Sequence, residues 1–306
     1  MINEPIEPVT AGDRVLAGAF ARWNDERGGA LVGLPEFPFP VMVSASERPA
    51  GERIARRADA ARRVLKRILG VEARLSLVVL SRRDWSAHAE VSAYGVTHRA
   101  RDGRLIVGAE PAAAWHAVSD YFGSRLSTRA RAELTAVHGV DASNGRGPDL
   151  SALAETLIAH EIAHLCAAQA GIAFPRRWLE EAFANHALVA VLGETDAAGL
   201  RRVTSLAEAG ATLDDALPTL AEFEANFGSM DVIPSVLAEL AITRSAYVAH
   251  AVYQAKPLAR LFAAFRDARL ARDADYELGR ILATRVHPSI AAIPLRFACA
   301  RVGIAA

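Results

Sequence analysis

The feature that most constrains this chain is the pentapeptide His160-Glu161-Ile162-Ala163-His164, which has no charged residue immediately on either side. The apolar residues around it have the spacing of an amphipathic helix. Residues four apart lie on one face of a helix, so both imidazoles can reach one tetrahedral Zn2+ ion, with Glu161 beside them as a candidate general base. A buried helix must also satisfy these polar groups, and a bound metal ion does so in one step.

Chance is a poor explanation for the pentapeptide. With nine histidines and 35 acidic residues, the chain would contain such a pattern about 0.03 times at random. The alternative interpretation is a structural helical protein in which two core histidines form hydrogen bonds with the backbone. A third ligand elsewhere in the chain would favour the metal site, because catalytic zinc has three protein ligands and one open position.

Composition and charge exclude several classes of protein. A length of 306 residues allows one large or two ordinary domains with a buried core and a cleft. The formal net charge of zero argues against a nucleic-acid partner, which would require an excess of Lys and Arg. Because no stretch of about 18 uncharged apolar residues appears, we expect no membrane span.

The two cysteines and the first residues bear on the cellular compartment. The chain starts with neither a basic segment nor an apolar centre, so we expect no secretory signal in it. Cys166 and Cys299 without such a signal predict a reduced, cytoplasmic protein. The oligomeric state is not indicated by the sequence.

The periodicity of apolar residues divides the chain into strands and helices. Residues 1–45 are rich in Pro and Gly and predict an extended segment that wraps the body of the protein. Short aliphatic runs predict strands at 75–80 and 104–108. The mixed segment 84–100 between them is predicted as a loop, with a candidate strand around 91–97. Helical spacing predicts helices over 50–69, 111–122, 127–138, 150–169, from 177 onward, and over 194–209, 218–227, 232–255, 257–270, 274–284 and 288–302.

The predicted helix over 50–69 has one apolar face and one face rich in arginine. We interpret the arginine face as solvated in preference to a contact for an acidic partner. Strands precede the long run of helices, and this order predicts an α+β fold in which an α+β lobe, residues 1–170, packs against an α-helical lobe, residues 171–306. Together they would form one catalytic module.

A third metal ligand is expected from the helix after the pentapeptide. An extended HExxHxxGxxH motif would need Gly at 167 and His at 170, and the chain has Ala167 and Ala170. The remaining solution is a glutamate from the next helix, which contains Trp178-Leu179-Glu180-Glu181-Ala182-Phe183-Ala184. This segment carries two adjacent glutamates within one short connection of the pentapeptide.

Together, the pentapeptide and the segment 178–184 resemble the gluzincin signature, HExxH followed by W-L-x-E-G-x-A. Gluzincins are peptidase MA-like zinc metallopeptidases related to thermolysin and the zinc aminopeptidases. The resemblance implies a zincin-like lobe with a small β-sheet, Zn2+ held by His160, His164 and Glu181, and hydrolysis of a peptide or protein substrate. Glu180 falls on the variable position before the ligand, and Ala182 replaces the usual glycine.

The resemblance also implies residues that assist the metal site. Related enzymes often have an acid or amide four residues after the third ligand that orients a zinc-bound histidine, and Asn185 stands there. They also carry a Tyr or His on a later helix that stabilises the oxyanion. Tyr247 fits that distance and helical setting, and Tyr253 and His250 are the alternatives. His186 is a rival ligand, although helical geometry turns it away from Glu181.

The mechanism implied is metal-assisted hydrolysis in which Glu161 takes a proton from water and passes it to the leaving amine. The strand 105–108 is a candidate sheet edge along which an extended peptide would add. Gly108-Ala109-Glu110 lacks the spacing and the asparagine of the aminopeptidase amine-binding element, so no aminopeptidase is predicted. The alternative function is a non-catalytic zinc-binding regulatory or interaction module with the same fold.

Overall fold

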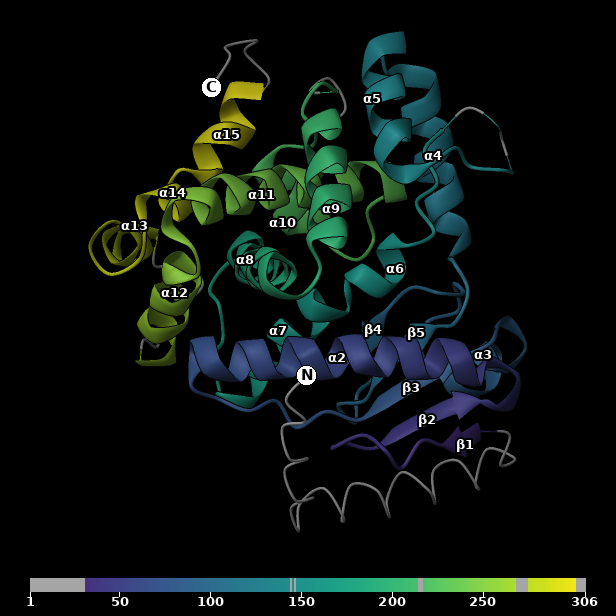
Figure 1. The fold of residues 1–306 in the computed structure, drawn as a ribbon. Helices are drawn as coiled ribbons and strands as arrows, with labels where there is room; N and C mark the ends of the chain where they lie inside the picture. The colour runs from purple at the N-terminus through teal and green to yellow at the C-terminus, as the bar shows by residue number, and fades with distance from the viewer. Residues whose placement is uncertain (1–30, 144, 146, 214–216, 268–274, 301–306) are drawn as a thin grey trace.

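A computed structural model describes residues 31–143, 145, 147–213, 217–267 and 275–300 (Figure 1). Within this part of the chain the fold is α+β, as the order of elements predicted. A small sheet and the long helix α2 (Arg48–Leu69) lie at one side of the molecule, and most of the helices gather on the other (Figure 1).

The sheet has five strands in the order β1-β2-β3-β5-β4. The central strands β2 (Val41–Ser44), β3 (Leu77–Leu80) and β5 (Leu105–Gly108) run parallel to one another. The outer strands β1 (Leu31–Gly33) and β4 (His98–Arg99) pair antiparallel with β2 and β5. Parallel strands are usually covered on both faces, which explains why β3 consists of aliphatic residues only.

Side chains alternate between two cores on the two faces of the sheet. Val79 and Val107 point into the large core that includes the apolar face of α2. Val78 and Ile106 point to the opposite face, where they pack in a smaller cluster with Trp85. Trp85 belongs to the short helix α3 (Arg82–His88), which therefore covers the second face.

Helix α2 lies directly on the sheet. A Cβ atom at Gly51 would come within 2.7 Å of the Val43 side chain, so only glycine permits this close approach. The arginine face of α2 is neutralised by acids of the same chain, with Arg53 against Glu155 and Arg57 Nη1 2.6 Å from Asp196 Oδ2. Several of the arginines on this face are therefore paired within the chain.

The remaining helices follow the predicted order. They are the short 3-10 helix η1 (Ala45–Glu47) and the α-helices α4 (Ala113–Arg125), α5 (Thr128–His138), α6 (Leu153–Thr156), α7 (Ile158–Gln169), α8 (Arg177–Thr195), α9 (Ala197–Gly210), α10 (Leu220–Asn226), α11 (Val232–Tyr253), α12 (Lys256–Asp267), α13 (Asp275–Thr284), α14 (Pro288–Ala291) and α15 (Ile293–Ala300).

Helix α8 occupies the centre of the helical part (Figure 1). It packs against α2, α7, α9, α11 and α12. Every residue from Trp178 to Leu192 except Glu180 is buried. One hydrophobic core runs from Leu34 to Phe297 and includes residues on both sides of the predicted lobe boundary at residue 170. The two helices that carry the predicted metal ligands therefore lie inside a continuous core.

Several predicted boundaries are wrong. The strand expected around 91–97 is a turn, and the strand in this region is β4, at residues 98–99. Because β4 pairs with β5, the strand at 105–108 is not the sheet edge. The helix expected over 150–169 is two helices that meet at Leu157, and the last predicted helix is divided into α14 and α15.

Two strands and one α-helix were not predicted as such, nor was the short helix η1. Residues 31–33 and 41–44, expected to be part of an extended wrapping segment, form strands β1 and β2. Residues 82–88 form helix α3, although most of this segment was predicted as a loop. The part of the wrapping segment that precedes residue 31 lies outside the described residues.

Helix α11 is the one helix in the described ranges that is long and apolar enough to cross a membrane by length and composition alone. This is weak evidence, because a buried core helix passes the same test, and 44% of its most apolar window is buried in the structure. In the structure α11 packs against α8 and α9.

Candidate metal centre

The pentapeptide lies on α7, whose two sides differ in burial. Ile162 and Ala163 are completely buried and anchor the helix in the core. His160 and His164 are on the other side, with side-chain exposures of 13% and 15%. The helical spacing thus holds both imidazoles at the core boundary, where a small solute can reach them.

A short connection returns the chain from α7 to α8. It turns at Gly171, whose φ of +70° favours glycine. Helix α8 has no side-chain cap at its first residue, and the carboxylate of Glu224 on α10 accepts from the Trp178 backbone N–H at 2.7 Å. This contact fixes the first turn of α8 and directs Glu181, whose side chain is only 4% exposed, toward α7.

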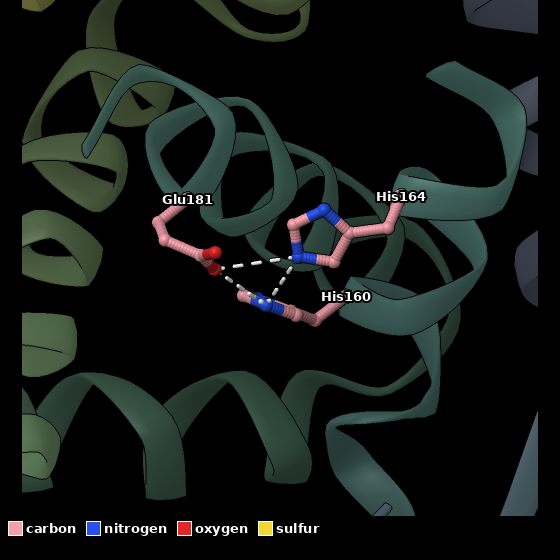
Figure 2. Close-up of side chains that lie close together, drawn as sticks. All are labelled: His160, His164 and Glu181. Carbon is pink, nitrogen blue, oxygen red and sulfur yellow. Dashed lines mark hydrogen bonds and ion pairs between the residues drawn. The ribbon is translucent and has the colours of Figure 1, made fainter. Parts of the chain in front are cut away.

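Three ligand atoms converge between the two helices (Figure 2). The Nε2 atoms of His160 and His164 are 3.0 Å apart, and Glu181 Oε2 lies 3.2 Å from the first and 3.3 Å from the second. Ligands at about 2.0–2.1 Å from a tetrahedral zinc ion are separated by about 3.3–3.4 Å. The residues present therefore fit one such ion, in both donor chemistry and spacing.

Contacts within the cluster shift the pKa values of its three side chains. Burial lowers the pKa of His164, but its hydrogen bonds to Glu180 and Glu181 outweigh burial and raise that pKa well above the ordinary value. His160 follows the same pattern, with Glu181 as its partner. Burial raises the pKa of Glu181, yet its hydrogen bonds to both histidines lower it far below the ordinary value. The charged form of Glu181 is thus stabilised by the two imidazoles beside it.

The structure distinguishes the roles of the two adjacent glutamates. Glu181 contacts the Nε2 atoms of both histidines, whereas Glu180 Oε1 lies 3.5 Å from Nδ1 of His164, on the other side of that ring. Arg177 Nη1 donates to Glu180 at 2.8 Å and holds it there. Glu180 thus lies within ion-pair distance of the His164 imidazole, on the side away from Glu181.

Asn185 assists the site in a different way from the one expected. Its side-chain amide donates to the backbone carbonyl of Glu181 at 3.0 Å and to Glu239 Oε2 at 2.7 Å. Its carbonyl oxygen accepts from the Thr243 hydroxyl at 2.7 Å. The described contacts therefore link Asn185 to the third ligand and to α11, and not to a histidine as the resemblance implied.

Glu239 is a component of the site that sequence reasoning missed. Burial and the nearby charge of Glu181 raise its pKa to about 7. The charges of His160 and His164 act on it in the opposite direction, which places it within electrostatic range of the whole cluster. A signal was present, because Glu239 is the only acidic residue in the apolar segment 232–253.

No hydrogen bond or ring contact among the described residues joins the predicted oxyanion donors to the cluster. Tyr247 lies on α11 eight residues after Glu239, about 12 Å along the helix axis, and its side chain has no hydrogen bond to a described residue. His250 lies against Gly193, near the far end of α8. Tyr253 packs on His287, with ring centroids 4.2 Å apart.

Two other predicted residues have clear positions. The rival ligand His186 is buried on α8 but is not a member of the group that could hold an ion. The Glu161 carboxylate forms no hydrogen bond or ion pair with a described residue, and it lines a pocket of about 260 Å³. Glu161 is therefore available to a water molecule or substrate, as a general base must be.

The chain was compared with models of protein families, with curated proteins and with solved structures, and no match was found. The resemblance to gluzincins therefore depends on the residues of the site alone.

Proposed function

We propose that this protein is a zinc-dependent peptidase of gluzincin type with a zincin-like fold. The observation that carries the proposal is the convergence of His160, His164 and Glu181 on one point, beside a Glu161 that has no partner among the described residues. Three protein ligands and one open position are the pattern of a catalytic zinc site. The substrate is a peptide or a protein segment.

Each residue of the site has a distinct task in hydrolysis. When bound, zinc supplies Lewis acidity toward the scissile carbonyl and lowers the pKa of water. The Glu161 carboxylate takes a proton from the attacking water and delivers it to the nitrogen of the leaving amine. Glu180 keeps the His164 ring in place, and Asn185 holds the backbone of Glu181 in position against α11.

The arrangement of elements supports the zincin-like fold. The small mixed sheet is followed in sequence by the pentapeptide helix α7 and then by the glutamate helix α8, and α2 packs against both helices. This order joins the sheet and the two ligand helices in one core, as a single catalytic module requires.

A non-catalytic zinc-binding module is the competing function. A purely structural zinc site normally has four protein ligands, and three groups converge in the described part of this chain. A structural site would also have no use for an unpaired carboxylate next to a pocket. Both points favour the enzyme.

The test is digestion of a proteome-derived peptide library by the zinc-loaded protein, with the products identified by mass spectrometry. We expect cleavage by the native chain and none by Glu161→Gln loaded with the same amount of zinc. Absence of cleavage by the native chain with full zinc occupancy would contradict the peptidase and favour the binding module.

A further inference from the structure

A second cavity, of about 440 Å³, opens between α2, the α6–α7 junction and the last turns of α8. None of the three candidate metal ligands lines it, so it is distinct from the metal centre. Its floor is apolar and includes the buried side chains of Ala61, Ile158 and Val191. Its rim carries charged side chains of both signs.

The charges at the rim are balanced within the chain. Arg53 Nε donates to Glu155 Oε1 at 2.9 Å. Arg57 lies between two carboxylates, with its Nη1 2.6 Å from Asp196 Oδ2 and its Nε 3.6 Å from Glu155 Oε2. The third arginine of the rim is paired with a glutamate on its own helix. The rim therefore has no large excess of either sign.

The same side chains retain capacity for further hydrogen bonds. A guanidinium has five N–H donors, and no hydrogen bond among the described residues uses Nη1 of Arg53 or Nη2 of Arg57. The side chains of Glu155 and Asp196 are 18% and 20% exposed, and each carboxylate can accept about four hydrogen bonds. Donors and acceptors are thus both available to a ligand at this rim.

Charge balance decides which ligand fits this cavity. A lone anion or a lone cation would add a charge for which the paired rim has no counterion. A zwitterion adds no net charge, because its carboxylate meets the arginines and its ammonium group meets Glu155 or Asp196. An apolar side chain on the same ligand would cover the floor. Since about 150 Å³ is enough for benzene, about 440 Å³ is ample for a free amino acid.

The wall between this cavity and the candidate general base is the α6–α7 junction. Ile158 and Ala159 line the cavity, whereas Leu157 and Glu161 line the pocket of about 260 Å³ on the other side. Leu157 ends α6 and begins α7, and its carbonyl oxygen accepts from the Glu161 backbone N–H at 3.3 Å. A ligand in the cavity therefore contacts the segment that carries Glu161 and the two histidines.

We infer that this cavity binds a free amino acid with an aliphatic side chain, and that the bound amino acid weakens the metal centre by displacing the α6–α7 junction. The binding is independent of the proposed peptidase function, and only its role as regulation rests on that function. Displacement follows because the ligand carboxylate competes with Glu155, on α6, for Arg53 and Arg57.

The first experiment is calorimetric titration of the metal-free protein with L-leucine. N-acetylleucine, which has no ammonium group, and leucinamide, which has no carboxylate, should each bind at least about tenfold more weakly, because one set of partners at the rim stays unused. Inorganic phosphate should bind no better than these two. Equal binding of leucine and N-acetylleucine, tighter binding of phosphate, or no binding of leucine would overturn the inference.

Variants place the binding in this cavity. Arg57→Gln should weaken leucine binding at least about tenfold. Arg63→Gln is the matched control, since Arg63 is on the same helix, is also paired with an aspartate and does not line the cavity. Ala60→Leu, which fills the cavity without removing a charge, is the second variant should Arg57→Gln fail to fold. Unchanged affinity in folded Arg57→Gln or Ala60→Leu would place leucine elsewhere and overturn the inference.

The second experiment measures zinc affinity with and without saturating leucine, in the native chain and in Arg57→Gln. Leucine should weaken zinc binding by the native chain at least about fivefold more than in the variant, which corrects for zinc held by leucine itself. Equal effects in the two proteins would overturn the regulatory role. If leucine binds but no peptide is cleaved, the peptidase proposal fails and the cavity stands. If peptides are cleaved but leucine does not bind, the cavity inference fails and the peptidase stands.

Discussion

The two partly buried histidines of α7 and the buried His186 of α8 have opposite tendencies to bind a proton. His160 and His164 on α7 face the carboxylates of α8, and their pKa values are raised. His186 on α8 is 3% exposed, its Nε2 has no hydrogen-bond partner among the described residues, and its pKa is lowered to about 3 by burial and by His250 and His287.

The difference shows what a pair of carboxylates does to a buried imidazole. Burial without a carboxylate partner keeps histidine neutral, because the charged form loses its hydration, and at His186 the charges of His250 and His287 add to this effect. A carboxylate at hydrogen-bond distance reverses that effect and creates a place where a cation is stable. The same residue type is thus a packing group at one position and a candidate ligand at the other.

The largest expected effect is on zinc binding, which should distinguish the α7 histidines from His186. Glu181→Ala should abolish stoichiometric zinc binding, because it removes the one carboxylate that faces both Nε2 atoms. His186→Ala should keep zinc, since that ring is outside the cluster. Zinc content after dialysis checks both. Full occupancy in Glu181→Ala, or loss in a folded His186→Ala, would reverse the assignment.

The next effect concerns the base. Glu161→Gln should reduce peptide hydrolysis by at least about 100-fold through loss of the proton acceptor, with zinc content unchanged. The measurement combines kcat with metal analysis of the same sample. If the variant loses its zinc, Glu161 is a ligand and not the base.

A smaller effect is expected from the contacts behind the third ligand. Asn185→Ala removes the amide that holds the Glu181 carbonyl and Glu239, and should weaken zinc affinity about 10- to 100-fold. Thr243→Val removes one hydrogen bond to Asn185 and should have a weaker effect of the same sign. Competition with a chelating dye measures both. Equal affinity in all three proteins would assign Asn185 to packing only.

The smallest effect is on stability. The folded pKa of His186, about 3, lies below the unfolded value of about 6.5. Its neutral form therefore supports folding above pH 6.5, and stability is lost as the pH falls below that value. Between pH 6.5 and pH 5 the loss is about 2 kcal/mol.

Denaturant unfolding of the native chain and of His186→Leu checks this pH dependence. The variant should lose about 2 kcal/mol less over the same interval, because it has no group to protonate there. Parallel curves for the two proteins would show that His186 is protonated in the folded state, and the contrast with the α7 histidines would disappear.

The parts of the site that depend on one helix or one loop were predictable from sequence. The spacing of His160 and His164 fixes their common face, and the short connection to α8 limits the third ligand to Glu180 or Glu181. Strand β3 was predicted for a similar reason, because its aliphatic residues identify it as a strand without information on the strands beside it.

The parts that depend on packing between distant segments were not predictable. Glu239 joins the site only because α11 packs across α8, and the pocket beside Glu161 needs four separate segments. Tyr247 was chosen by distance along the chain, which does not determine where a residue on α11 lies relative to α7. Strand β2 is four residues long, and only its pairing with β1 and β3 identifies it.

The most direct test of the central claim is zinc titration of the metal-free native chain, with X-ray absorption at the zinc edge to identify the ligands. We predict one zinc ion per chain with two imidazole ligands and no sulfur. Failure to bind zinc stoichiometrically, or a zinc ion bound through a cysteine sulfur, would contradict the claim that His160, His164 and Glu181 form a metal centre.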